Sequence, residues 1–282
     1  MTTVLPLPKF FDLLITNYSP SVSLPPAPHP RYTPPMPADW KTDTALPEPI
    51  RTGLVRFCDQ LTAALGEQLL AITLYGGLAK GEFVAGNSDV NVLVVLRTAS
   101  LATLDALVPA LEQARNDFPL ALLTLTEAEL PTATEVFPIK FTDLQRHHRT
   151  LVGREIFAQL EITRDRLRRQ CARELQNLLL RSRAFYLQRG RRPEQLEETL
   201  THAISSLLAT LGALIELKTG ERPDTKSATV ARADQLGLNA QLLRDLLALK
   251  RGELKPNADQ LKQLFGAFLE TIHQAARLTE KL

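Results

Sequence analysis

Two apolar runs on either side of a glycine-rich segment constrain the fold of this chain of 282 residues more than any other feature. The first run spans residues 69–75 (LLAITLY) and the second spans residues 90–96 (VNVLVVL). Four glycines lie between them, Gly76, Gly77, Gly81 and Gly86. Partly β-branched runs of this length are typical of buried strands, and glycines mark turns. The pattern therefore predicts a strand, a glycine turn, a short helix, a loop and a second strand.

Two polar residues stand at the start of the second predicted strand. Because side chains alternate between the faces of a strand, Asp89 and Asn91 share one face, whereas Val90 and Val92 point to the other. The glycine pair after the first strand lets backbone N–H groups approach an anion closely, and a following helix would add the positive end of its dipole. This arrangement predicts a phosphate site.

Gly76-Gly77, followed a dozen residues later by Asp89-Val90-Asn91, resembles the signature of nucleotidyltransferases of the polymerase-β type, which include the aminoglycoside and minimal nucleotidyltransferases. In that family the glycine turn holds a triphosphate, two carboxylates bind Mg²⁺, and a third carboxylate on a later strand completes the site. The resemblance covers about residues 50 to 150 and implies Mg²⁺ with ATP or another NTP. It implies Gly76, Gly77, Lys80 and Ser88 as nucleotide-binding residues, and Asp89 and Asn91 as the catalytic and metal-binding pair.

The sequence departs from the family pattern at the second carboxylate, which is Asn91 here. A neutral amide oxygen lowers the affinity for Mg²⁺, and two-ion transfer depends on anionic ligands. The next predicted strand, residues 120–126 (LALLTLT), contains no acid. Three candidates for the third carboxylate remain, Glu135, Asp143 and Glu174. Lys140, in a strand predicted over residues 136–142, can neutralise a phosphate but cannot bind Mg²⁺.

Each of these residues also has a purely structural interpretation. The glycine pair forms a strand-to-helix turn, Asp89 caps a loop, and Asn91 is a buried amide with its hydrogen bonds satisfied. Lys140 is an exposed strand lysine, and Asp143 is the N-cap of the helix that follows it. We favour the nucleotide-site interpretation for the glycines with Asp89, and the structural interpretation for Lys140 and Asp143.

The elements around this motif predict an α/β domain with a small mixed sheet over residues 47–153. Helices are expected over residues 47–66 and 101–116, a strand over 120–126, and a helical turn over 127–134. This alternation is typical of a sheet covered on one face. His147 and His148 are interpreted as solvent-facing or backbone-bonded residues, because no third metal ligand stands nearby in the sequence.

Residues 1–46 form a proline-rich arm with a short helix predicted over residues 9–17. We expect the arm to pack on the domain that follows, because it carries several aromatic residues; a polyproline ligand for another protein is the alternative. The net charge is only +2, and the two cysteines are too few for a disulfide framework. We expect a cytoplasmic protein without a membrane partner, because the apolar runs are short and no signal pattern is present.

Residues 154–282 predict an all-α helical bundle. Helices are expected over five ranges, residues 164–189, 195–217, 225–236, 240–249 and 257–281. Residues 164–192 carry ten arginines against only Asp165 and Glu174. These arginines bind a triphosphate or an RNA backbone, or they form a solvated helix face that pairs with neighbouring acids. The second interpretation is preferred, and nucleic acid is not the expected partner.

Three functions follow from these observations. The first is a nucleotidyltransferase-like protein that binds an NTP with Mg²⁺ in a cleft between its domains and transfers a nucleoside monophosphate to a hydroxyl on a small molecule or a protein. The second is an inactive member of the fold that acts as a nucleotide sensor or a partner-binding scaffold. The third is an RNA-binding module that uses the arginine-rich helix.

Overall fold

A computed structural model describes residues 40–282, except Asn87 and Gln159. The predicted helix over residues 9–17 and most of the proline-rich arm lie outside the described residues. The chain divides into two compact units. In the described chain, the first unit comprises residues 40–132 and 144–160, and the second comprises residues 133–143 and 161–282.

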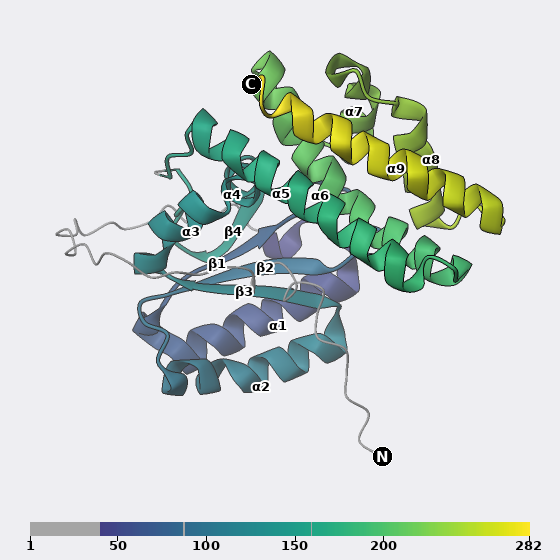
Figure 1. Ribbon diagram of the computed structural model, residues 1–282. Coiled ribbons are helices and arrows are strands. Elements are labelled where there is room, and N and C mark those ends of the chain that lie inside the picture. Colours follow the sequence, from purple (N-terminus) through teal and green to yellow (C-terminus); the bar gives the residue numbers. More distant parts are fainter. Residues whose placement is uncertain (1–39, 87, 159) are drawn as a thin grey trace. The chain divides into compact units, whose positions relative to one another are not determined.

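The first unit is built on a mixed four-stranded sheet (Figure 1). Its strands are β1 (Leu69–Tyr75), β2 (Val90–Leu96), β3 (Leu120–Thr126) and β4 (His148–Gly153). Their order is β3-β2-β1-β4, with β2 parallel to β3 and with β1 antiparallel to both β2 and β4. The sheet confirms the predicted fold class and the bounds of the first three strands.

Two helices, α1 (Glu48–Leu65) and α2 (Leu101–Asp117), cover one face of this sheet (Figure 1). A proline lies in the first turn of α1, where its fixed φ suits a helix start. The Ser100 hydroxyl caps α2 by accepting a hydrogen bond from the Thr103 N–H at 3.2 Å. Alternate residues of β2, including Val90, Val92 and Val94, belong to the core beneath these helices. The predicted separation of Asn91 from Val90 and Val92 is thus confirmed.

Trp40 ties the start of the described chain to this core. The residue lies in the short 3₁₀ helix η2 (Trp40–Thr42), and its side chain is buried. The indole N–H donates a hydrogen bond to the backbone carbonyl of Leu151 in β4 at 2.9 Å. Because a buried indole N–H needs a partner, this bond fixes the chain against the sheet.

Four local predictions are wrong. The segment after the glycine pair is a turn over residues 76–81 and not a short helix. The strand predicted over residues 136–142 is helical, because α3 (Leu130–Val136) is followed by α4 (Pro138–Arg146). Asp143 therefore lies inside α4 and is not an N-cap, and Lys140 is a half-buried helix residue and not an exposed strand lysine. The fourth strand is β4, which is preceded in the chain by η4 (Glu127–Glu129), α3 and α4.

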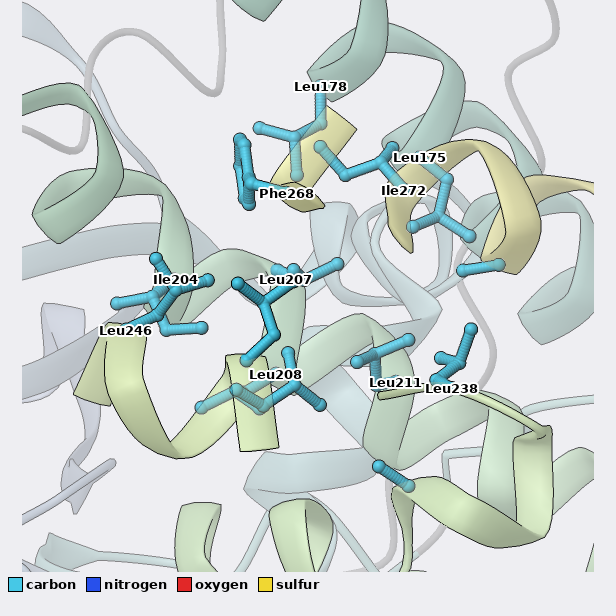
Figure 2. Packing of buried hydrophobic residues seen from close by; sticks show 14 of the residues in the cluster. Leu175, Leu178, Ile204, Leu207, Leu208, Leu211, Leu238, Leu246, Phe268 and Ile272 are labelled. Carbon is cyan, nitrogen blue, oxygen red and sulfur yellow. The ribbon is translucent and has the colours of Figure 1, made fainter. Parts of the chain in front are cut away.

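The second unit is a helical bundle, as predicted. Its long helices are α5 (Arg164–Arg189), α6 (Pro193–Thr219), α8 (Ala240–Arg251) and α9 (Ala258–Leu278), and α7 (Lys226–Ala231) with η5 (Ala233–Leu236) are short. Figure 2 shows how leucine, isoleucine and phenylalanine side chains from different helices fill the core of this unit. Asn257 closes a capping box with Gln260 at the start of α9.

Helix α6 is the core helix of this bundle. By length and composition it is also apolar enough to cross a membrane, which the short apolar runs of the sequence did not lead us to expect. However, 61% of its most apolar window is buried inside the protein, and Leu207, Leu208 and Leu211 are among its fully covered side chains. Core helices of water-exposed bundles share this composition.

Candidate functional site

The glycine turn at the end of β1 is a single helix-like turn. The Lys80 N–H donates to the Gly76 carbonyl at 3.1 Å, and the Glu82 N–H donates to the Gly77 carbonyl at 2.7 Å. Gly76 has a φ of +75°, which strongly favours glycine. In the described structure, the N–H groups of Gly77, Leu78 and Ala79 have no backbone partner. Three consecutive unpaired N–H groups can donate hydrogen bonds to a bound anion. No full helix follows this turn, so no helix dipole is added.

Asp89 and Asn91 lie directly beside this turn. Asp89 is exposed and precedes β2, and Asn91 pairs in register with Tyr75, the last residue of β1. The Asn91 amide nitrogen Nδ2 donates to the backbone carbonyl of Asp89 at 3.2 Å. A Cβ placed on Gly76 would come within 2.8 Å of the same Nδ2 atom. The Asn91 side chain is therefore held between the glycine turn and its own strand end.

The loop between the turn and β2 is closed by Ser88. The Val84 N–H donates to the Ser88 hydroxyl at 3.1 Å, and the Ser88 N–H donates to the Val84 carbonyl at 2.9 Å. Ser88 thus has a structural role next to Asp89. Lys80 is half-buried and lies within the turn, so the turn and the motif bring together all six residues predicted for the site.

The position for a third carboxylate is apolar in this unit. In the parallel pair β2–β3, Asn91 is in register with Ala121, and Leu93 is in register with Leu123. The acids considered from the sequence, Glu135, Asp143 and Glu174, all belong to the second unit. Across the described residues, no group of three His, Cys, Asp or Glu side chains is arranged to hold a metal ion. Asp89 has the amide of Asn91 and the side chain of Ala121 as neighbours, and this set of one carboxylate does not fit a two-ion Mg²⁺ centre.

These acids have their own partners in the helical unit. Glu135 pairs with Arg166 at 2.5 Å, and Glu174 accepts a hydrogen bond from Gln170 at 2.5 Å. Burial raises the pKa of Glu174, although two arginines oppose that shift. Burial also lowers the pKa of Lys140 to about 7. Lys140 therefore differs from an ordinary surface lysine, which is a property that the sequence alone did not reveal.

A second polar cluster lies on the same face of the sheet as Asn91. His148 of β4 is in register with Tyr75, which is itself in register with Asn91. One ring nitrogen of His148, Nδ1, faces the Leu144 carbonyl at 2.7 Å, and the other, Nε2, faces the Glu155 carboxylate at 2.7 Å. The contact with a backbone carbonyl confirms the backbone-bonded interpretation of this histidine. Burial raises the pKa of Tyr75.

Glu155 is the centre of this cluster and was missed from the sequence. Besides His148, its carboxylate accepts hydrogen bonds from the Thr150 hydroxyl at 3.1 Å and the Phe157 N–H at 2.7 Å. Burial raises the pKa of Glu155, but these donors outweigh it and hold the pKa below its ordinary value. The residue follows an unpredicted strand and has no motif around it, so only the fold identifies it.

The arginine-rich helix α5 is partly neutralised within its own unit. Arg168 and Arg169 both pair with Asp165, and Arg168 also donates to the carbonyl of Thr279 at 3.3 Å. Together with the Arg166–Glu135 pair, these contacts occupy the arginines in the first turns of α5. They support the interpretation of this half of the helix as an ion-paired face.

No protein-family model matches the chain, and no curated protein matches it. Among solved structures, it is similar to a spectinomycin adenyltransferase from Enterococcus faecialis, which was crystallised with ATP and spectinomycin. The superposition has a TM-score of 0.52 at 14% sequence identity and covers 79% of this chain and 98% of that chain. The chain therefore shares the fold of this adenyltransferase, which confirms the predicted nucleotidyltransferase-like fold.

Proposed function

We propose that this protein binds a nucleoside triphosphate through the turn over residues 76–81 and Asp89, and that it acts as a nucleotide sensor without efficient nucleotidyl transfer. The fold supports the first part, because the similar adenyltransferase was crystallised with ATP. The unpaired N–H groups of Gly77, Leu78 and Ala79 provide donors for phosphate oxygens. Lys80 supplies a positive charge in the same turn.

The absence of efficient nucleotidyl transfer is proposed because of the chemistry and the hydrogen bonding of Asn91. Its amide nitrogen donates a hydrogen bond to the backbone carbonyl of Asp89, so the side chain is bound to the backbone of the motif. The amide also carries no negative charge. The strand position beside it is Ala121. Nucleotidyl transfer by two ions needs anionic oxygens that stabilise charge on the attacking and leaving groups. In this proposal, Asp89 is the residue that would contact a metal ion bound together with the nucleotide.

An active transferase is the alternative function. It would move a nucleoside monophosphate to a hydroxyl of a small molecule or a protein, with other groups in place of the missing carboxylates. The similarity to an enzyme crystallised with spectinomycin is the observation that favours a small-molecule acceptor. Both cysteines are unbridged and buried, which suits the reducing cytoplasm that we expect for either function.

The experiment that tests the proposal rebuilds the missing carboxylates. The variant Asn91→Asp with Ala121→Asp adds one acid on β2 and one beside it on β3, next to Asp89, which precedes β2. We expect Mn²⁺, measured by electron paramagnetic resonance in the presence of ATP, to bind this variant at least about tenfold more tightly than the wild type. A control for added charge is Ala128→Asp, which adds one acid at an exposed position after β3.

Two outcomes would contradict the proposal. If the wild type already binds Mn²⁺ with ATP as tightly as the rebuilt variant, then its own site is complete and the active transferase is favoured. If neither protein binds ATP at all, the fold does not act as a nucleotide site. A gain in the control equal to that in the rebuilt variant would show a nonspecific effect of charge.

A further inference from the structure

Helix α5 presents a row of arginines and leucines on its outward side. Arg173, Leu180, Arg183 and Leu187 are spaced so that they share one side of the helix, opposite the buried Leu175 and Leu178. Leu187 is 85% exposed and Leu180 is 52% exposed. Within the described part of the chain, Arg183 forms neither an ion pair nor a hydrogen bond. We call these four residues the basic stripe.

Helix α2 presents a row of the opposite charge. Leu101, Asp105, Val108 and Glu112 share its outward side, whereas Leu107, Ala110 and Ala114 are buried. Leu101 is 75% exposed and Val108 is 43% exposed. Neither Asp105 nor Glu112 takes part in an ion pair among the described residues. We call the four outward residues the acidic stripe.

The two stripes match when the helices run antiparallel. Each has two apolar residues seven positions apart, Leu101 with Val108 and Leu180 with Leu187, so both pairs span about 10.5 Å of helix. Asp105 lies four residues after Leu101, and Arg183 lies four residues before Leu187. Antiparallel pairing therefore sets Leu101 against Leu187, Val108 against Leu180, and Asp105 against Arg183.

Further along the same register, Glu112 falls opposite Gln176, one helical turn from Arg173. Long arginine side chains reach an acid at that separation, so the charges remain complementary beyond the two apolar contacts. Exposed apolar residues stand at this spacing on both helices, and such residues are buried when helices of two chains pack together. RNA would contact the arginines of the basic stripe through its phosphates, but it would not account for the matching row of apolar and acidic residues on α2.

We propose that the occupant of the basic stripe is the acidic stripe of a second copy of this chain. The pairing is heterologous, because it joins the α5 surface of one copy to the different α2 surface of the other. The inference does not depend on nucleotide binding, because none of the eight stripe residues belongs to the candidate nucleotide site.

Sedimentation velocity over a range of concentrations of the full chain tests this proposal. We expect the wild type to associate, and Leu187→Glu to raise the dissociation constant at least about tenfold. Arg183→Asp and Asp105→Arg should each weaken association, and the double variant should restore it because the charges are exchanged. Leu282→Glu is the matched control, since Leu282 is an exposed leucine outside both stripes.

A cross-linking measurement tests the register directly. Leu101→Cys protein mixed with Leu187→Cys protein should form a disulfide-linked dimer under mild oxidation, whereas each variant alone should not. The native Cys58 and Cys171 are buried and do not compete. A protein that is monomeric at every concentration would overturn the proposal, whether or not it is retained on RNA. So would association that Leu187→Glu leaves unchanged, or a charge exchange that does not restore it.

Discussion

Replacing Gly76 by alanine should destabilise the first unit much more than replacing Gly77. Gly76 has a φ of +75°, and a Cβ at that position would lie 2.8 Å from Nδ2 of Asn91. Gly77 has no positive φ in the left-handed region, and its Cβ would lie 3.6 Å from the Glu82 carbonyl, an ordinary contact. The two neighbouring glycines thus form a matched pair of substitutions.

The magnitude follows from three effects. A left-handed alanine costs about 1–2 kcal/mol, and displacing Asn91 from the Asp89 carbonyl costs about 0.5–1.5 kcal/mol. The smaller entropy of the unfolded chain returns about 0.4–1 kcal/mol in either variant. We therefore expect Gly76→Ala to lower the free energy of unfolding by about 2 kcal/mol, and Gly77→Ala to leave it unchanged or slightly higher.

Urea unfolding followed by the fluorescence of Trp40 measures this difference. Trp40 is the single tryptophan and is buried in the first unit, so its signal reports that unit. Asn91→Ala removes the atom that the new Cβ meets, so in that background the cost of Gly76→Ala should fall to the backbone component. Equal stability of the Gly76→Ala and Gly77→Ala proteins would refute the described turn.

Three further predictions concern titratable groups. Because the pKa of Glu155 is held below its ordinary value of 4.5, its contribution to stability is present above pH 4.5 and is lost as the pH falls through the lower, folded pKa. Between pH 7 and pH 3, urea unfolding followed by Trp40 should therefore show a smaller loss of stability for Glu155→Gln than for the wild type. Because burial lowers the pKa of Lys140 to about 7, the unfolded chain binds more protons between pH 7 and 10.5, so stability rises over that range. Circular dichroism during urea unfolding should show that rise flattened in Lys140→Met. Burial raises the pKa of Cys58 and Cys171 to about 12, so iodoacetamide at pH 7.5 should alkylate neither thiol in the native protein, as mass spectrometry can check; rapid native labelling would contradict their burial.

Much of the fold can be predicted from local sequence, because its strands and helices carry strong signals. The alternating pattern of β2, with its polar residue at Asn91, fixed both the strand and the face of the sheet that carries the site. The helices of the second unit begin and end at proline, glycine and capping residues. These are the places where local chemistry and tertiary structure agree.

The wrong prediction for residues 136–142 and the missing prediction of β4 both have physical reasons. Val136, Ile139 and Phe141 favour a strand by propensity, but Pro138 starts a helix there, and the Thr142 hydroxyl donates to the Pro138 carbonyl at 2.8 Å. Strand β4 pairs only with β1 at the sheet edge, and its first residues are polar.

The candidate site divides in the same way. The glycine turn and Asp89 have a local motif, so the sequence revealed them. Glu155 was missed because its partners, His148, Thr150 and Phe157, meet it through the turn that follows β4, which no local pattern signals. The sequence showed that residues 120–126 contain no acid, but only the strand register identified Ala121 as the neighbour of Asn91.

Calorimetric titration of ATP, with and without Mg²⁺, into the wild type, Asp89→Ala and Asn91→Asp tests the central claim most directly. We predict that the wild type binds ATP, that Asp89→Ala reduces the contribution of Mg²⁺ to binding, and that Asn91→Asp increases it because a second carboxylate joins the first. The absence of ATP binding in all three proteins would contradict the claim that this fold serves as a nucleotide site.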